Sequence, residues 1–560
     1  MFGNKSLPSR IYSYGAKPPI QGGEIVDQQM RLASKYRNAI VEAELGRRRR
    51  VDEALRRLSP ELSSIEGLIK ETEEEIEIAR AGIRKENQRS RSRDANPETV
   101  GTIRGAKSKL KELRTRRKVL RTALFASEEW TKDNDEIRLW YNVERKRIRS
   151  ESALYWGTYL HVEQAMSNCS SGAPPRFAHW DGGGHLAVQI QHGAPAGGVF
   201  ACSDNRIRIE PVDDSAWLPG GRRLRRTKAW FRVGSDDKGG PVWAVVPFVL
   251  HRPIPVDASI KWVHLIRRRI GTHCEWRIQF VLSRAAGWRR SDQAESGRVG
   301  IDVGWRIRPG GDLRVAYWHD HDGQSGELCL PAGWLEQMQK TRDIQSIRDM
   351  RFNAALAAIV RRLAVLAVPD WLREATQNLA SWRSAGRLAA VAIRWRTSRF
   401  NGDEETFAEL ESWRKRDKHL LEYGANLRDQ LQRSREDLYR VFAAKLRRTY
   451  RTAVIEDLDL RNFHKLPKPE EEAADPALRE HVRDACLSTL IKCVKESMSE
   501  TVEAPAKNTT RLHQCGSLED WDRKELEHIC TNCGERYDQD LCAAVNLLRY
   551  DASVEVAAGI

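Results

Sequence analysis

The chain has 560 residues, with 94 lysines and arginines against 78 aspartates and glutamates, a formal net charge of +16 and a pI of about 9.4. This excess favours polyanions such as nucleic acids, although a basic protein of a membrane surface has a similar composition. The most apolar stretch, 354–368, is interrupted by Arg361 and Arg362, and the first residues lack an apolar segment, so we predict neither a membrane span nor a signal peptide. Ten cysteines, some of them clustered, predict a reducing cytoplasm.

The first 170 residues are predicted to be mainly helical. Residues 1–25 are expected to supply an early strand, and 26–170 a helical domain. Apolar residues at helical spacing mark an acidic arm at 62–78 and a basic arm at 103–124, with a turn at 89–97 between them. We predict an antiparallel helical hairpin whose arms pair partly by opposite charge, with a homodimeric coiled coil as the alternative.

Residues 171–296 contain several short strand-like segments separated by Gly, Pro and Asp turns, which predicts a β-barrel. Arginines alternate there with Trp230, Phe231 and Trp262, a combination that suits contact with a nucleic-acid backbone and stacking on bases. Together with a basic run in the helical domain, the candidate nucleic-acid-binding residues are Arg47, Arg48, Arg49, Arg50, Arg222, Arg223, Arg225, Arg226, Arg267, Arg268 and Arg269.

Three acidic residues follow a pattern that is typical of a divalent-metal site. Asp302 and Glu456 each end an apolar strand, and Asp540 begins an apolar helix in which Ala543 and Ala544 permit close approach to a sheet. Such carboxylates bind Mg²⁺, and paired Mg²⁺ ions activate water for phosphodiester hydrolysis. The neighbouring acids that could replace them are Asp457, Asp459 and Asp538.

A cysteine-rich segment directly precedes Asp540. It carries two groups of nitrogen and sulfur ligands separated by a short loop, which predicts a tetrahedral structural zinc site. The candidate ligands are His513, Cys515, Cys530 and Cys533, with His528 as the alternative to His513. Of the other seven cysteines, all except Cys542 lack ligand spacing and are expected to be reduced and half-buried.

The order G-I-D-x-G, I-E-D-L, zinc element and D-x-x-A-A-x-N resembles the RuvC-like nuclease of type V CRISPR effectors and of transposon-encoded RNA-guided nucleases. The resemblance covers roughly 297–560. It implies that Asp302, Glu456 and Asp540 form the catalytic, magnesium-binding triad and that the four ligands above bind zinc. The chain departs from the family at Leu512 and His513, where a cysteine pair is usual, and at Cys542, where the family has Asn. The second departure predicts impaired cleavage, because a thiol is a poor substitute for an amide.

The small size and the N-terminal sequences at 11–15 and 36–50 are similar to type V-M effectors. This resemblance implies a monomeric protein that uses a CRISPR guide RNA to open target double-stranded DNA beside a short flanking motif. It also implies that the complex silences its target by binding, with little or no cutting. An RNA-guided, Mg²⁺-dependent endonuclease with the same triad is one alternative. A transposase-like DNA-binding protein that needs no RNA is the other.

The resemblance further implies a multidomain α+β fold: a helical recognition lobe inserted in a β-barrel (wedge or OB-like) domain, then an RNase H-like α/β (RuvC) domain split by a helical insertion and a zinc element. The expected boundaries are 1–25 for the first part of the barrel, 26–170 for the recognition domain, 171–296 for the rest of the barrel, 297–507 for the RuvC-like domain with its insertion at 333–450, 508–537 for the zinc element, and 538–560 for the last RuvC motif and C-terminal helix.

Overall fold

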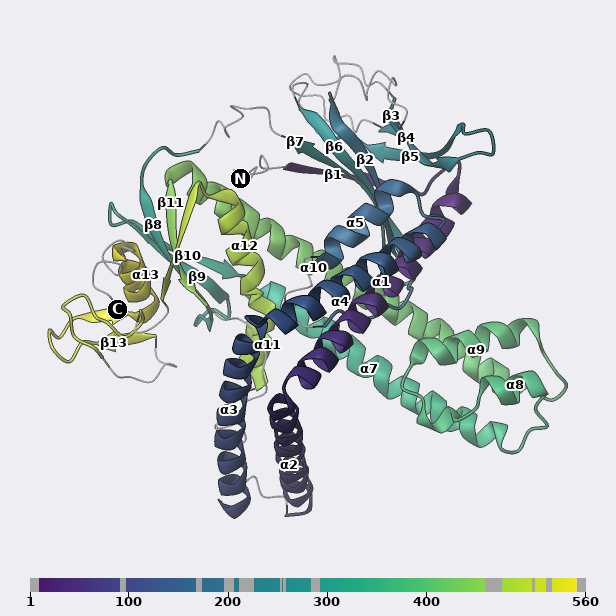
Figure 1. Ribbon diagram of the computed structural model, residues 1–560, viewed down its shortest axis with the longest axis horizontal. Coiled ribbons are helices and arrows are strands. Elements are labelled where there is room, and N and C mark those ends of the chain that lie inside the picture. The colour runs from purple at the N-terminus through teal and green to yellow at the C-terminus, as the bar shows by residue number, and fades with distance from the viewer. Residues whose placement is uncertain are drawn as a thin grey trace. The chain divides into compact units, whose positions relative to one another are not determined.

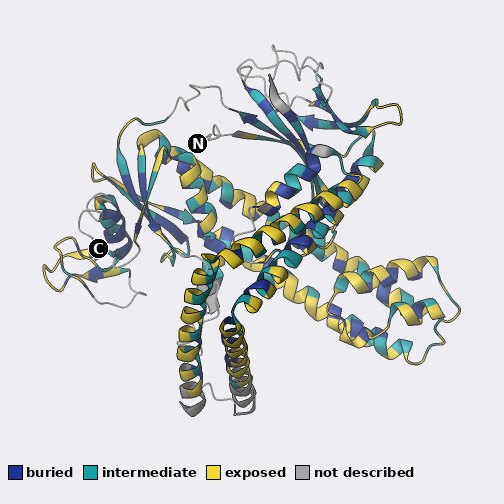
Figure 2. Cartoon of the chain, in the orientation of Figure 1, coloured by how far each residue is buried: buried dark blue, intermediate teal, exposed yellow. Residues whose placement is uncertain are grey.

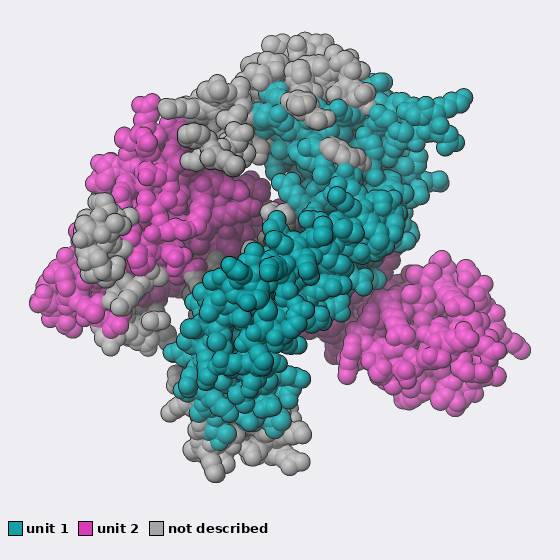
Figure 3. Space-filling view, viewed as in Figure 1, with its two compact units in different colours: residues 1–269, 274–288 teal, residues 270–273, 289–560 magenta. Residues whose placement is uncertain are grey.

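The computed structural model describes residues 10–90, 97–167, 174–195, 206–210, 226–251, 254, 258–283, 293–458, 476–505, 509–519 and 526–550. The chain forms two compact units, one of residues 1–269 and 274–288 and the other of 270–273 and 289–560 (Figure 3). Each unit has a buried core centred on its own sheet, and the buried positions follow the strands of both sheets (Figure 2).

The sheet of the first unit has seven strands in the order β2-β6-β7-β1-β5-β4-β3, all paired antiparallel (Figure 1). The strands are β1 Arg10–Ala16, β2 Gly184–Pro195, β3 Ile207–Ile209, β4 Arg226–Ser235, β5 Pro241–Val249, β6 Ser259–Ile270 and β7 His273–Ser283. The predicted strands are therefore confirmed. The N-terminal segment supplies the central strand β1, as expected, between β7 and β5.

The prediction of a closed β-barrel is wrong. Among the described residues the sheet is open, with β2 and β3 as its two edges. One face buries a core that also takes in Val26 and Met30 of helix α1 (Gly23–Leu58). Alternating apolar residues show which face of a strand is buried, but closure requires that the first and last strands pair with a matching shear. The sequence pattern does not contain that information.

The described residues of the first unit form four further helices: α2 Pro60–Ser90, α3 Pro97–Phe125, α4 Glu128–Glu151 and α5 Trp156–Ser167. The predicted helical hairpin is confirmed by α2 and α3, which bury Ile65, Ile69 and Leu110 in one cluster. The acidic and basic arms also pair directly, with 2.5 Å between Arg116 and Glu61. The two apolar stripes thus pack on each other within one chain.

The second unit contains a five-stranded mixed sheet in the order β10-β9-β8-β11-β12. The strands are β8 Arg298–Ile307, β9 Leu313–Asp320, β10 Ser325–Leu330, β11 Thr452–Asp457 and β12 Glu500–Pro505. Strand β11 lies parallel to both β8 and β12, whereas β8, β9 and β10 are antiparallel. The two strands that carry the predicted acids are therefore neighbours, although a long helical segment separates them in the sequence.

That intervening segment is helical, as predicted for 333–450. It comprises α7 Ala332–Leu363, α8 Asp370–Ala375, a 3-10 turn at Leu379–Ser381, α9 Ala385–Thr397 and α10 Glu404–Thr449. The other elements that the structure describes in this unit are α11 Pro476–Ala485, α12 Leu487–Ser497, the hairpin β13 Glu527–Ile529 and β14 Arg536–Asp538, and α13 Gln539–Arg549. None of the helices in the described parts of the chain is long and apolar enough to cross a bilayer.

Candidate metal centre

Asp302 and Glu456 lie side by side on the parallel strands β8 and β11. The register pairs Ile455 with Ile301, and each acid follows its partner by one residue. Because side chains alternate along a strand, both carboxylates point to the same face of the sheet. Both are buried. The two acids therefore meet on neighbouring strands, as expected, but Asp302 lies within β8 and not at its end.

Helix α13 brings the third carboxylate to the same face. A Cβ atom at Gly300 would lie 2.1 Å from the carbonyl oxygen of Ala544, so the helix backbone rests on the bare strand there. Asp540 lies four residues before Ala544, about 6.0 Å along the helix axis, and Asp302 is two residues after Gly300, about 6.6 Å along the strand. The close contact at Gly300 therefore sets Asp540 beside Asp302. The small residues at 543 and 544 have the predicted role, and both are fully buried.

The electrostatics show how closely the three acids are crowded. Burial raises the pKa of Asp302 well above its usual value, and the negative charges of Asp540 and Glu456 raise it further. Burial also raises the pKa of Glu456, against a hydrogen bond that the hydroxyl of Thr509 donates to it. A cluster of buried carboxylates is stabilised by cations, and this all-oxygen donor set fits Mg²⁺. These three residues could hold the ion.

Two arginines, which sequence reasoning missed, neutralise part of this cluster. Arg314 on β9 is 1% exposed and bonds to Asp540, while its Nη1 atom donates to Asp538 and Glu327, both at 2.9 Å. Arg306 reaches Asp540 at 3.4 Å. The signal in the sequence was an arginine within the apolar strand 313–316, since a fully buried arginine requires a carboxylate partner.

The neighbouring acids that the sequence offered as substitutes for the triad residues do not take their place in the described structure. Asp538 caps helix α13: its Oδ1 accepts hydrogen bonds from the N–H groups of Asp540 at 2.8 Å and Leu541 at 3.3 Å. Asp457 is exposed at the end of β11, and Asp459 lies outside the described residues. Asp538 therefore positions Asp540 by fixing the start of the helix.

The four predicted zinc ligands converge. One donor atom from each of His513, Cys515, Cys530 and Cys533 lies within 4.8 Å of the others, a set of three sulfurs and one nitrogen that fits a tetrahedral zinc ion. His528 is not a member of this group among the described residues. The neighbouring Glu519, also missed from the sequence, accepts a hydrogen bond from the N–H of Thr531 at 3.2 Å and thereby joins the two ligand loops.

Cys542 points toward the zinc element. Its thiol lies 3.1 Å from the carbonyl oxygen of Leu512, and its side chain is buried with Cys530 and Tyr537. The amide that supports the triad indirectly is instead Asn546, which donates to the carbonyl of Thr509 at 2.8 Å. The side chain of Cys542 therefore points away from that of Asp540, because two residues along a helix turn a side chain by about 200°.

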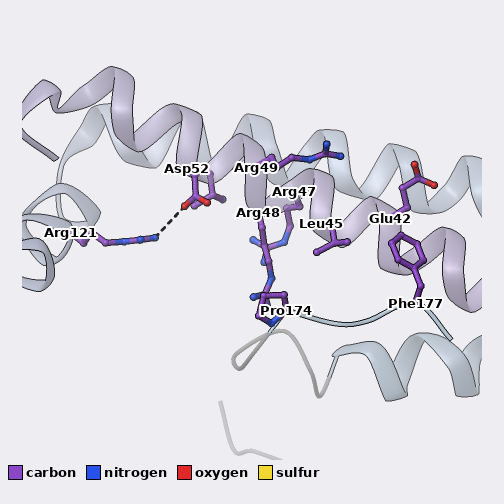
Figure 4. Close-up of a pocket in the computed structure, with 10 residues that line it drawn as sticks. Glu42, Leu45, Arg47, Arg48, Arg49, Asp52, Arg121, Pro174 and Phe177 are labelled. Atoms are coloured by element: carbon purple, nitrogen blue, oxygen red, sulfur yellow. Dashed lines mark ion pairs between the residues drawn. The ribbon is translucent and has the colours of Figure 1, made fainter. Parts of the chain in front are cut away.

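The basic run in α1 is largely engaged within the protein. Arg47 and Arg48 both bond to the buried Glu44, at 2.7 and 3.0 Å, and Arg50 stacks on Trp140 at 4.2 Å. Arg47, Arg48 and Arg49 line a surface cavity of about 670 Å³ (Figure 4). Neutralised by Glu44, the first two contribute less to an electrostatic surface than the sequence implied.

The arginines of the seven-stranded sheet fall into two groups. Arg267 is mostly buried and pairs with Asp27 at 2.7 Å, so it has a structural role. Arg226, Arg268 and Arg269 are exposed. The predicted residues Arg222, Arg223 and Arg225 lie outside the described part of the chain.

Comparison with known proteins identifies the family. The chain is 33% identical over 565 residues to the CRISPR-associated DNA-binding protein Cas12m of Allomeiothermus silvanus, in an alignment that covers 99% of both chains. It is 37% identical over 424 residues to the protein of the same name from Thermanaerosceptrum fracticalcis, an alignment that covers 72% of this chain and 71% of the relative. No family profile matches the chain. A solved Cas12f1–sgRNA–target DNA complex superposes on 97% of this chain and 99% of its own, but only loosely, with a TM-score of 0.36 and 11% identity.

These relatives define the class: the protein is a type V CRISPR effector. The chain belongs to the Cas12m family of CRISPR-associated DNA-binding proteins. The resemblance to type V-M effectors that the sequence motifs indicated is confirmed.

Proposed function

We propose that this protein is an effector that uses a CRISPR guide RNA to bind double-stranded DNA beside a short flanking motif, forms an R-loop, and silences its target mainly by binding. The observation that carries the proposal is family membership, since relatives along its whole length are named DNA-binding proteins. The net charge of +16 supports a nucleic-acid partner. In such effectors base pairing reads the sequence, while the protein reads the flanking motif and the duplex shape.

In this proposal residues 297–507, 508–537 and 538–560 form a RuvC-like nuclease domain with its zinc element. Asp302, Glu456 and Asp540 would hold Mg²⁺, which when bound activates water for attack on a phosphodiester. The chain's own contribution is to place the three carboxylates together on β8, β11 and α13. Their convergence is also what supports the alternative function, an RNA-guided endonuclease.

We favour weak or absent cleavage because of the two arginines at the triad. Arg314 and Arg306 place positive charge on Asp540, which is one of the three carboxylates that the metal requires. A cation entering the site must compete with these ion pairs, and the buried pair with Arg314 is costly to break. The site therefore supports a lower metal affinity than an unpaired triad would.

The deciding experiment uses the protein assembled with its CRISPR RNA, a matched DNA duplex and Mg²⁺. We expect stable binding, with DNA that stays mostly intact for hours and an affinity that changes by less than about twofold in Asp302→Ala, because the triad contributes little to binding. Gel electrophoresis measures cleavage, and filter binding measures affinity. Rapid cutting that disappears in Asp302→Ala would establish the endonuclease instead.

The same binding assay distinguishes an RNA-guided effector from a DNA-binding protein that needs no RNA. Protein free of RNA is expected to bind the duplex weakly and without sequence preference, because the guide provides the base pairing. Equally tight, sequence-specific binding without RNA would favour an RNA-independent, transposase-like protein.

We also propose that the arginines named from the sequence, except Arg267, which pairs with Asp27, contribute to the nucleic-acid interface, and the exposed ones allow a test. Replacing Arg226, Arg268 and Arg269 with alanine should weaken RNA binding and reduce the slope of log K against log salt by about 0.7 for each phosphate that the protein no longer neutralises. Titrations over a range of salt concentrations measure the slope. A matched control removes the same charge at Arg138, Arg147 and Arg373, each of which pairs with an acid on its own helix. An equal effect in both variants would mean that only net charge matters.

A further inference from the structure

Three histidines of the first unit meet on one face of the seven-stranded sheet. They come from helix α5 (His161), strand β2 (His185) and strand β6 (His264). One ring nitrogen from each lies within 4.8 Å of the others. Nothing in the zinc element or the acidic triad involves these residues, which belong to a different part of the chain.

The strand pairing explains how two of the rings meet. Antiparallel β2 and β6 place Ala187 opposite His264, so His185, two residues before Ala187, is the diagonal neighbour of His264 on the same face. The opposite face of these strands packs in the main core with Leu186, Val188 and Leu265. The two imidazoles therefore lie on the face away from that core.

Helix α5 supplies the third ring through an unusually close approach to β2. A Cβ atom at Gly157 would lie 2.3 Å from the carbonyl oxygen of Ala187, and the hydroxyl of Thr158 accepts a hydrogen bond from the N–H of Ala187 at 3.3 Å. His161 follows these two residues by about one turn, so it lies on the same side of the helix. Its ring centre is 4.1 Å from that of His185.

The environment suits metal ligation. His264 is 7% exposed, and the indole of Trp262 stacks against it at an angle of 11°. His185 Nε2 and His264 Nδ1 are 2.7 Å apart, a hydrogen-bond distance at which one of the two nitrogens must accept and its ring must therefore be neutral. A neutral imidazole offers a nitrogen lone pair, which is the form that binds metals.

We propose that His161, His185 and His264 form a second metal site, which takes a divalent transition-metal ion of the imidazole-binding class, with Zn²⁺ as its representative. Three histidine nitrogens at about 2.0–2.1 Å leave a fourth position for water, as in known sites with three protein ligands. In the structure, His185 Nε2 and His264 Nδ1 are 2.7 Å apart. Metal binding would replace this contact and move the two nitrogen atoms to about 3.3 Å from each other, the separation of two ligands in a tetrahedral zinc site. Bound there, the ion ties α5 to the edge of the sheet.

Zinc counting on the full-length protein tests the site. Wild-type protein equilibrated with Zn²⁺ and then passed through a desalting column should hold about two ions per chain, one in the Cys/His element and one in the histidine site. His161→Gln should hold about one, since glutamine replaces the half-buried ring without leaving a void. His179→Gln, which changes an exposed histidine outside the cluster, should keep about two.

Cobalt substitution identifies the ligands independently of the variants. Co²⁺ added to protein whose Cys/His element is already filled with zinc should produce visible d–d bands without a thiolate-to-cobalt band, and His161→Gln should abolish them. Zn²⁺ should also raise the Tm of wild-type protein more than that of His161→Gln. A single zinc per chain that Cys530→Ser/Cys533→Ser removes, with no thiolate-free cobalt spectrum, would overturn the proposal. The three rings would then be a hydrogen-bonded packing cluster. Neither result bears on DNA binding or cleavage, so this test is separate from that of the proposed function.

Discussion

Replacing Cys530 and Cys533 together with serine is expected to remove one zinc ion and to unfold the zinc element. Among the described residues this element has only a small core of its own: the hairpin β13–β14 has three residues in each strand, and its buried cluster consists of Cys530, Tyr537 and Cys542. In zinc-finger peptides, metal binding supplies about 10–16 kcal/mol of apparent free energy, and without it they do not fold. The double variant should therefore lose a folding free energy of similar size in its zinc element.

Metal analysis of purified protein checks the zinc content, and limited proteolysis checks whether residues 509–537 become accessible. Cys274→Ser is the matched control, because Cys274 is an exposed cysteine outside the four-ligand group. It should leave both measurements unchanged. Undiminished zinc at the Cys/His element in the double variant would show that the four residues are not the ligands.

The second large effect is expected from Gly300→Ala. The added Cβ would lie 2.1 Å from the carbonyl oxygen of Ala544 and 2.7 Å from the backbone nitrogen of Leu548, and neither backbone atom can move without the helix. Overpacking of this kind costs about 3 kcal/mol of the free energy of unfolding. Because α13 would shift away from β8, Asp540 should separate from Asp302 and Mg²⁺ binding should weaken.

Urea unfolding gives the change in stability, and calorimetric titration gives the affinity for Mg²⁺. Gly304→Ala is the control on the same strand, and a Cβ there meets no atom within 4 Å. It should change neither quantity appreciably. Equal stability of the two variants would mean that α13 does not rest on β8 at Gly300.

Several features could be predicted from the sequence because they are local patterns. Alternation and helical spacing identified the strands and helices, and the pairs of zinc ligands have a spacing that few other structures require. Asp302, Glu456 and Asp540 could be grouped from the motifs around them, although Asp302 lies within β8 and not at its end. The small residues after Asp540 predicted the close approach of α13, and the structure locates that contact at Gly300.

The open sheet, the arginine contacts at the acidic triad and the histidine cluster could not be predicted. Each depends on tertiary structure, because it arises between residues that are far apart in the sequence. Whether the seven strands close is decided by the edges β2 and β3, and no periodicity within a strand encodes their pairing. Arg314 reaches Asp540 across 226 positions, and His185 meets His264 across 79. A lone arginine or histidine has no spacing to recognise, so its partner is known only once the sheet has brought the two strands together. The direction of Cys542 likewise follows from the rotation of α13 against β8, which packing at Gly300 determines.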